Sequence, residues 1–323
     1  MKRIALLLVF ALASLLSVQP VLAQTCSFTP LTSTPPVLTG RLAYQDDSVG
    51  QLYLYDFAIA TRTLITQSGW SVTLPRNPIF SPNGKAIIFS ADQSGQRDLY
   101  YWVIGAANPT NLTVGFGSHV NEDPHFSPLS GKVVWKKDFN IWVATLQFDG
   151  SGNPSLTGIT QLTTTGVQGT STEASDPNYS PSEKYIYFYT GVTTDRQLQR
   201  YNTTTHLTAA IPKTTGVAYY YPVDVDLYDF QYVSWLNATN THDKIYFYSI
   251  PLQSASVWNA TDCDNDNSDP APADENNFIY SRFESTGYQL YIGQFANSAN
   301  VWNLSALNTS GSDLKGSNYT NAR

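Results

Sequence analysis

Charge is scarce in this chain of 323 residues: Asp, Glu, Lys and Arg make up only 13% of it, about half the usual share of roughly 25%. Methionine occurs once, and Ala, Leu, Glu and Lys never cluster over the length of a helix. These absences exclude a coiled coil, and the lack of a glycine at every third position excludes collagen. In contrast, 21 Tyr, 15 Phe and 7 Trp provide ample core material, which excludes intrinsic disorder. Because strands favour aromatic and β-branched residues, the composition predicts an all-β protein.

Only one long apolar run occurs, and it lies at the start of the chain. Lys2 and Arg3 precede the apolar residues 4–16, and Ala23 ends a stretch suited to signal peptidase. Residues 1–23 are therefore predicted to be a secretory signal peptide and not a membrane span, followed by an N-terminal segment at 24–38. Without Lys2 and Arg3 the chain keeps 16 basic and 25 acidic residues, a net charge of −9. With no basic stripe, nucleic acid is excluded as a partner.

Cysteine is limited to Cys26 and Cys263. In an oxidising compartment the two are expected to form a disulfide, the alternative being two unpaired thiols. Eight Asn-x-Ser/Thr sequons permit glycosylation in a eukaryotic host. They lie at Asn111, Asn178, Asn202, Asn237, Asn259, Asn303, Asn308 and Asn318.

An internal repeat runs through the chain. Its clearest copies read Asn-Pro-Ile-Phe-Ser-Pro, Asp-Pro-His-Phe-Ser-Pro and Asp-Pro-Asn-Tyr-Ser-Pro, each followed by a Lys and an apolar run. The lead prolines, two weaker copies included, are spaced by 46, 53, 45 and 48 residues: Pro78, Pro124, Pro177, Pro222 and Pro270. This period is typical of a four-stranded propeller blade. The aromatic residue of each copy is expected to pack between neighbouring sheets, and the Ser-Pro-x-Gly stretch to form a tight turn.

The repeat resembles the PD40 (TolB-like, WD40-like) β-propeller repeat over residues 39–323. The resemblance implies a propeller, and the lead prolines together with a partial N-terminal unit give six blades. Residues 318–322 parallel the first strand of the other copies. We therefore expect this C-terminal segment to complete the N-terminal blade and close the ring, which removes exposed sheet edges.

Four antiparallel strands per blade place the loops that enter the first strands on one face, at the mouth of the central channel. Ligand-binding candidates at this mouth are Arg76, Asn77, His119, Glu122, Asp123, Ser175, Asp176, Tyr220, Tyr221 and Asp269. Each has a structural alternative. An Asp before Pro serves as a strand-entry residue that accepts local backbone bonds. Arg76 forms either an ion pair with Glu122 or Asp123 or an anion site. The two tyrosines are either core residues or a platform for a sugar ring.

Other charged positions fall outside the mouth. An outer rim is expected to carry Asp46, Asp47, Asp92, Lys137, Asp195, Arg196, His242 and Glu284. The run 262–269 places carboxylates at alternate positions, as oxygen-rich Ca²⁺ loops do, with Asp262, Asp264, Asp266 and Asp269 as candidate ligands. It lacks the Gly and Glu of an EF-hand, so a solvated acidic loop is the alternative, and no other cofactor is expected.

Two functions fit these patterns. The first is a secreted module that binds an extracellular protein or glycan at its mouth without chemistry. The second is a polysaccharide lyase acting on uronic-acid polymers, in which Arg76 neutralises the uronate and a His or Tyr abstracts a proton. No zinc-type His pair and no Gly-x-Ser-x-Gly elbow is present. Whether the protein is an enzyme stays open at this point.

Overall fold

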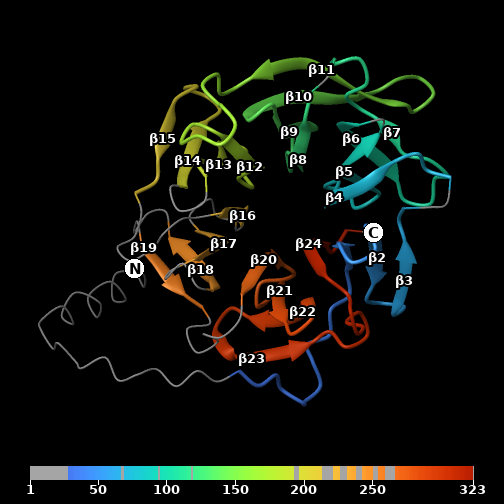
Figure 1. Ribbon diagram of the computed structural model, residues 1–323, viewed down its shortest axis with the longest axis vertical. Coiled ribbons are helices and arrows are strands. Elements are labelled where there is room, and N and C mark those ends of the chain that lie inside the picture. Colours follow the sequence, from blue (N-terminus) through green and yellow to red (C-terminus); the bar gives the residue numbers. More distant parts are fainter. Residues whose placement is uncertain are drawn as a thin grey trace, which may run out of the picture.

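The computed structural model describes residues 28–66, 69–93, 95–117, 119–192, 196–212, 221–225, 231–237, 242–249, 254–258 and 266–322. The predicted signal peptide, Cys26 and Cys263 lie outside these residues. Every regular element in the described ranges is a β-strand. The strands form four-stranded antiparallel sheets arranged around a common axis (Figure 1). The prediction of an all-β propeller is therefore confirmed.

Six such sheets are found among the described residues. The strands of each sheet are given below from the axis outward (Figure 1). The first sheet contains β24 (Leu314–Thr320), β1 (Arg41–Asp46), β2 (Gln51–Asp56) and β3 (Thr61–Leu64). The second contains β4 (Thr73–Phe80), β5 (Ala86–Gln93), β6 (Gln96–Val103) and β7 (Thr110–Asn111). The third contains β8 (Asn121–Phe126), β9 (Lys132–Lys137), β10 (Asn140–Phe148) and β11 (Pro154–Gln161).

The remaining sheets repeat this order. The fourth contains β12 (Ala174–Tyr179), β13 (Tyr185–Thr190), β14 (Gln197–Asn202) and β15 (Thr208–Ala210). The fifth contains β16 (Tyr221–Val225), β17 (Gln231–Asn237), β18 (Asp243–Ser249) and β19 (Ser254–Val257). The sixth contains β20 (Asn267–Pro272), β21 (Asn277–Glu284), β22 (Gly287–Gln294) and β23 (Asn297–Asn303). Each repeat copy with a lead proline therefore corresponds to a sheet whose innermost strand contains that proline.

The repeated aromatic residue packs between sheets, as expected. Phe80 lies in one buried cluster with Leu54 of the first sheet and Phe89 of its own sheet. Phe126 is buried with Tyr101 of the preceding sheet, so the copy led by Pro124 uses its aromatic side chain in the same way. These clusters are shared between neighbouring sheets, so no single sheet provides a complete core.

The Ser-Pro-Asn-Gly stretch forms the predicted turn between β4 and β5. The amide of Gly84 donates to the carbonyl of Ser81 at 2.7 Å, and Gly84 has a φ of 67°. A Cβ at this position would lie 2.5 Å from the carbonyl oxygen of Ala322. Glycine is therefore required both by the left-handed backbone and by the C-terminal residues that cross the turn.

The first sheet contains strands from both ends of the described chain. β24 pairs antiparallel with β1, with Leu42 opposite Tyr319. The amide of Phe80 donates to the side-chain oxygen of Asn318 at 2.9 Å, so β24 also contacts the second sheet. The strand covers Leu314–Thr320, beginning four residues before the 318–322 segment named from the sequence.

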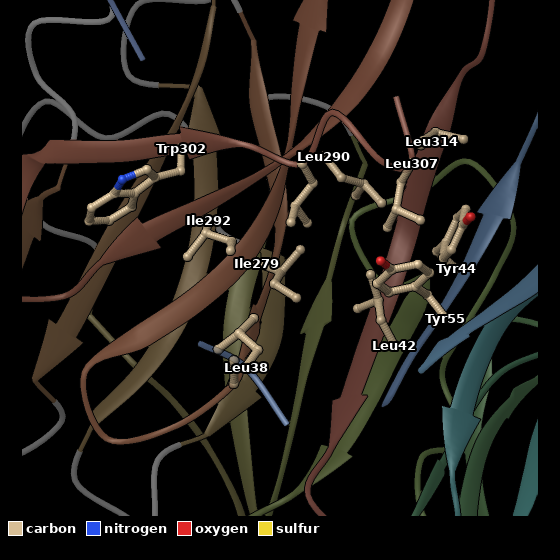
Figure 2. Close-up of a cluster of buried hydrophobic side chains, with 12 residues drawn as sticks. Leu38, Leu42, Tyr44, Tyr55, Ile279, Leu290, Ile292, Trp302, Leu307 and Leu314 are labelled. Carbon is tan, nitrogen blue, oxygen red and sulfur yellow. The ribbon is translucent and has the colours of Figure 1, made fainter. Parts of the chain in front are cut away.

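The largest buried cluster joins the first sheet to the sixth. Figure 2 shows Tyr44 and Tyr55 beside Leu307 and Leu314. The N-terminal segment covers the edge of the sixth sheet, because the amide of Leu31 donates to the carbonyl of Val301 at 2.7 Å. No helix able to cross a membrane is found in the part of the chain that the structure describes.

Candidate functional site

Five residues, one on each of five innermost strands, share an unusual backbone conformation. Each has a φ between 48° and 54°, and each is the third residue of its strand except Asn77, which is the fifth. The five are Asn77, Asp123, Asp176, Asp269 and Gly316. Each sits at an irregularity in the pairing of its strand with the next one. We call these five residues the axial ring. Left-handed φ is tolerated by Gly and, among other residues, chiefly by Asn and Asp, which explains the residue types.

Contacts between neighbouring sheets hold the axial ring together. The amide side chain of Asn77 donates to Asp123 Oδ1 at 2.5 Å. Asp123 also accepts the backbone N–H of Asp176 and shares a side-chain hydrogen bond with its carboxyl. The amide of Gly316 donates to Asp269 Oδ2 at 3.4 Å. Each ring residue named here therefore bonds to a neighbouring sheet. Asp269 Oδ2 also accepts a local hydrogen bond from the hydroxyl of Ser268 at 3.1 Å, so local bonds and bonds between sheets occur together.

Gln45 completes the ring on the first sheet. Its side-chain oxygen accepts the backbone N–H of Asn77 at 3.0 Å. A Cβ on Gly316 would lie 2.9 Å from the same Gln45 oxygen, so no larger residue fits there without displacement. Gln45 was not a candidate from the sequence, because the partial N-terminal unit lacks the Asn/Asp-Pro pair that marks the other sheets.

The three carboxyl groups of the axial ring are disfavoured as anions. Burial raises the pKa of Asp123, of Asp176 and of Asp269 above the usual value. For Asp176 the pKa lies well above that value, because the charges of Asp123 and Asp269 add to the effect of burial. Lys136 and Arg196 oppose this rise but do not cancel it.

Lys136 on β9 supplies a positive charge that acts on Asp123 and Asp176, as Lys315 does on Asp269. Its ammonium group is buried and lies 3.2 Å from Glu122 Oε2 and 3.6 Å from Glu173 Oε1. Burial alone would lower the pKa of Lys136, but the nearby Asp123 and Glu122 raise it. Sequence reasoning missed this residue. The signal was there: the sister copies carry an uncharged residue, such as Ser90 or Ser281, at the same position.

Of the two alternatives for Arg76, the ion pair with Glu122 or Asp123 is not formed. Arg76 is exposed on β4, and among the described residues it forms no ion pair. Arg97 takes its place instead, with its Nε 3.4 Å from Glu122 Oε1 and 2.8 Å from Asp92 Oδ1. The side chain of Asp123 is occupied by the ring contacts.

The other mouth candidates are dispersed. His119 Nδ1 contacts Asp138 Oδ2 in the turn between β9 and β10. Tyr221 begins β16, and Tyr220 lies outside the described residues. The lyase hypothesis requires a His or Tyr beside Arg76, and no contact among the described residues joins Arg76 to His119.

The predicted Ca²⁺ loop is only partly described. Asp262 and Asp264 lie outside the described residues, whereas Asp266 accepts the backbone N–H of Asp243 at 2.9 Å. Asp269 belongs to the axial ring. Within the described ranges, no group of three or more His, Cys, Asp or Glu side chains is placed to hold a metal ion. Calcium binding by the four carboxylates stays a prediction.

No protein-family model matches the sequence. Solved structures do match it in fold. TolB from Acinetobacter baumannii superposes with a TM-score of 0.64 at 13% identity, over 88% of this chain and 67% of that one. A chain of a nidogen–laminin complex gives a TM-score of 0.63 at 10% identity, over 88% of this chain and 99% of that one.

A peptidase is also similar. A puromycin-hydrolysing peptidase from Mycobacterium tuberculosis gives a TM-score of 0.56 at 12% identity, but this chain covers only 46% of it. These identities show a shared fold and nothing more. Together with the repeat and the sheet topology, they establish that the chain has a TolB-like β-propeller fold.

Proposed function

We propose that this protein is a secreted, non-catalytic β-propeller that binds a partner protein at the axial ring, and that the partner contributes a positively charged segment. The observation that carries the proposal is the presence of three carboxyl groups, on Asp123, Asp176 and Asp269, where the backbone requires only a residue that tolerates positive φ. Asn77 and Gly316 meet that requirement without a charge.

Carboxylates at these positions are costly to the fold. Burial and mutual repulsion disfavour their ionised forms, as the raised pKa of Asp176 indicates. Two cations near the ring are already paired, Lys136 with Glu122 and Glu173. Lys315, beside Asp269, is paired with Asp47 and Asp313. A cationic group from outside would supply the missing countercharge. Perturbed carboxyl groups grouped in this way are typical of binding or catalytic sites.

The comparisons support a binding module. The similar structures include TolB and a component of a nidogen–laminin complex, the latter a protein–protein assembly by its description. We further propose that the six sheets form one closed ring, with β24 as the closing strand. The pairing of β24 with β1 supports this part of the proposal. Secretion is supported by the apolar run behind Lys2 and Arg3.

A peptide titration with a charge-matched control tests the proposal. Labelled hexalysine and hexaglutamate are titrated into the protein, and binding is followed by fluorescence anisotropy. Wild type is expected to prefer hexalysine. The double variant Asp176→Asn/Asp269→Asn is expected to weaken its binding at least tenfold, since a hydrogen bond to a charged group contributes about 1.5–3 kcal/mol.

The control removes two charges elsewhere. Asp149→Asn/Glu275→Gln changes exposed residues and alters the net charge equally. It should leave hexalysine binding within about twofold, because exposed charges interact weakly. Equal losses in both double variants would show nonspecific attraction to an acidic protein and would refute a site at the axial ring.

A further inference from the structure

A polar recess separate from the axial ring lies on the first sheet. Its volume is about 440 Å³, and it lies between the turn after β1 and the turn 309–312 that precedes β24. Asp46, Ser48, Tyr53, Arg62, Gly311 and Ser312 line it. Small-molecule sites commonly measure roughly 300–1,000 Å³, so the recess has room for one or two sugar rings.

Asp46 presents one free carboxylate oxygen to this recess. The residue is only 5% exposed. Its Oδ1 accepts three hydrogen bonds, from the hydroxyl of Ser48 at 2.5 Å and from the amides of Ser48 and Asp313 at 3.2 Å. No described donor bonds to Oδ2. These three bonds fix the carboxylate, and Oδ2 is left as an acceptor held in place.

Arg62 is held in place by aromatic rings. Its guanidinium carbon lies 3.7 Å from the centre of the Tyr53 ring. Tyr53 in turn stacks on the buried ring of Tyr44, with centroids 5.7 Å apart. Figure 2 shows Tyr44 on the side of the first sheet that faces Leu307 and Leu314. Stacking orients the guanidinium plane, and Arg62 has no hydrogen-bond acceptor among the described residues.

The gap between these two charged groups has the dimensions for a bridging hydroxyl. Arg62 Nη2 and Asp46 Oδ2 are 3.9 Å apart, beyond the range of about 2.7–3.2 Å for a direct hydrogen bond. A hydroxyl oxygen placed beside both groups accepts from the guanidinium and donates to the carboxylate. A purely anionic ligand would be repelled by Asp46, and a purely cationic one by Arg62.

We propose that this recess binds a neutral saccharide, with adjacent hydroxyl groups bridging Arg62 and Asp46. The hydroxyl of Ser48 and the turn at Gly311 border the remaining sugar oxygens. The site differs from the axial ring in position and in charge, because it pairs one cation with one anion. It therefore does not depend on the cationic partner proposed above.

Saturation-transfer NMR with three methyl α-hexopyranosides, of the gluco, manno and galacto series, tests the proposal. At least one is expected to give transfer to its ring protons. Arg62→Met and Asp46→Asn are each expected to weaken that binding about tenfold or more. Arg200→Met is the matched control, because Arg200 stacks on Tyr185 at 4.5 Å on another sheet. It should leave binding unchanged.

Three results would overturn the proposal. The first is no transfer from any of the three sugars at millimolar concentration. The second is transfer that both Arg62→Met and Asp46→Asn leave intact. The third is tighter binding of methyl glucuronoside, which would indicate an anion site at Arg62. Hexalysine should not compete with the sugar, so this experiment is independent of the test of the axial ring.

Discussion

At Asp176 the backbone conformation favours the residue type, whereas its surroundings disfavour the negative charge. Its backbone has a φ of 50°, and its carboxyl has a pKa well above the usual 3.8 because of burial and the charges of Asp123 and Asp269. In such a group the protonated form is favoured by folding. Its contribution to stability is fully present below the unfolded-state pKa and is lost as the pH rises through the folded-state pKa.

Asp176→Asn is therefore expected to raise the melting temperature at pH 7. Asn keeps the left-handed conformation and a donor for Asp123, and it removes the charge. Melting temperature rises by roughly 2 °C per kcal/mol in a chain of this size. Thermal unfolding between pH 4 and pH 8 provides the measurement, and the advantage over wild type should shrink towards pH 4.

Asp149→Asn is the control, and the opposite effect on stability is expected for it. Asp149 is fully exposed, and hydrogen bonds from Asn153 lower its pKa. Its ionised form is the one that folding favours, so the change should lower stability slightly at pH 7. An equal gain in both variants would show that charge removal in general, rather than the position of Asp176, stabilises the protein.

Replacement of Asp176 by Ala tests the backbone requirement together with the side-chain hydrogen bond to Asp123. Ala removes the charge as Asn does, but it loses that bond and disfavours a φ of 50° by about 1–2 kcal/mol. Denaturant unfolding should therefore rank Asp176→Ala below Asp176→Asn by at least that amount. If the two variants are equally stable, positive φ does not select the residue type at this position.

Among the strands, β22 shows how closely the propeller is packed. Gly293 has an ordinary φ, yet a Cβ there would lie 2.6 Å from Trp258 and 2.8 Å from Phe278. Gly293→Ala is expected to destabilise the protein by about 1–3 kcal/mol, the usual cost of overpacking. Gly150→Ala is the control, since nothing lies within 4 Å of its added Cβ. Urea unfolding of the two variants gives the comparison.

The contact between β24 and β4 can be tested through one side chain. Asn318 Oδ1 accepts the backbone N–H of Phe80 at 2.9 Å. Asn318→Ala leaves that partly buried amide without its acceptor, so a loss of about 1–3 kcal/mol is expected. Asn297→Ala, at the exposed start of β23, should cost much less. Similar losses from both would mean that the β24 contact contributes nothing particular to stability.

How far the sequence predicts these elements depends on the kind of signal. The Phe-Ser-Pro repeat specifies packing between sheets, and packing at Phe80 and Phe126 leaves a periodic apolar pattern that can be read directly. The Asn/Asp-Pro pairs were also visible. Their structural role could not be predicted, because Asn and Asp are favoured both in turns and at strand positions with positive φ.

The charge partners were the least predictable part of the candidate site. Arg76 stands next to the ring residue Asn77 in the sequence, but Arg97 on β6 makes the ion pair with Glu122. Long side chains reach their partners from neighbouring strands, and no local pattern encodes that choice. The Asp46–Arg62 recess was missed for the same reason: its two charges come from β1 and β3, at opposite edges of β2.

At the scale of the whole molecule, the sequence prediction of secretion awaits a direct test. We propose that Gln24 is the mature N-terminus and that Cys26 is joined to Cys263. The secreted protein should therefore begin at Gln24 by N-terminal sequencing. Labelling of the denatured, unreduced protein should find no free thiol, and two reactive thiols would refute the disulfide.

The pairing of β24 with β1 also sets an order of events during synthesis. The amide of Asp313 donates to Asp46, a contact that spans 267 residues. Until residues 314–320 leave the ribosome, β1 lacks its inner neighbour and exposes an unpaired edge. Contacts of such long range slow folding. The first sheet of a nascent chain therefore stays incomplete until β24 has been synthesised.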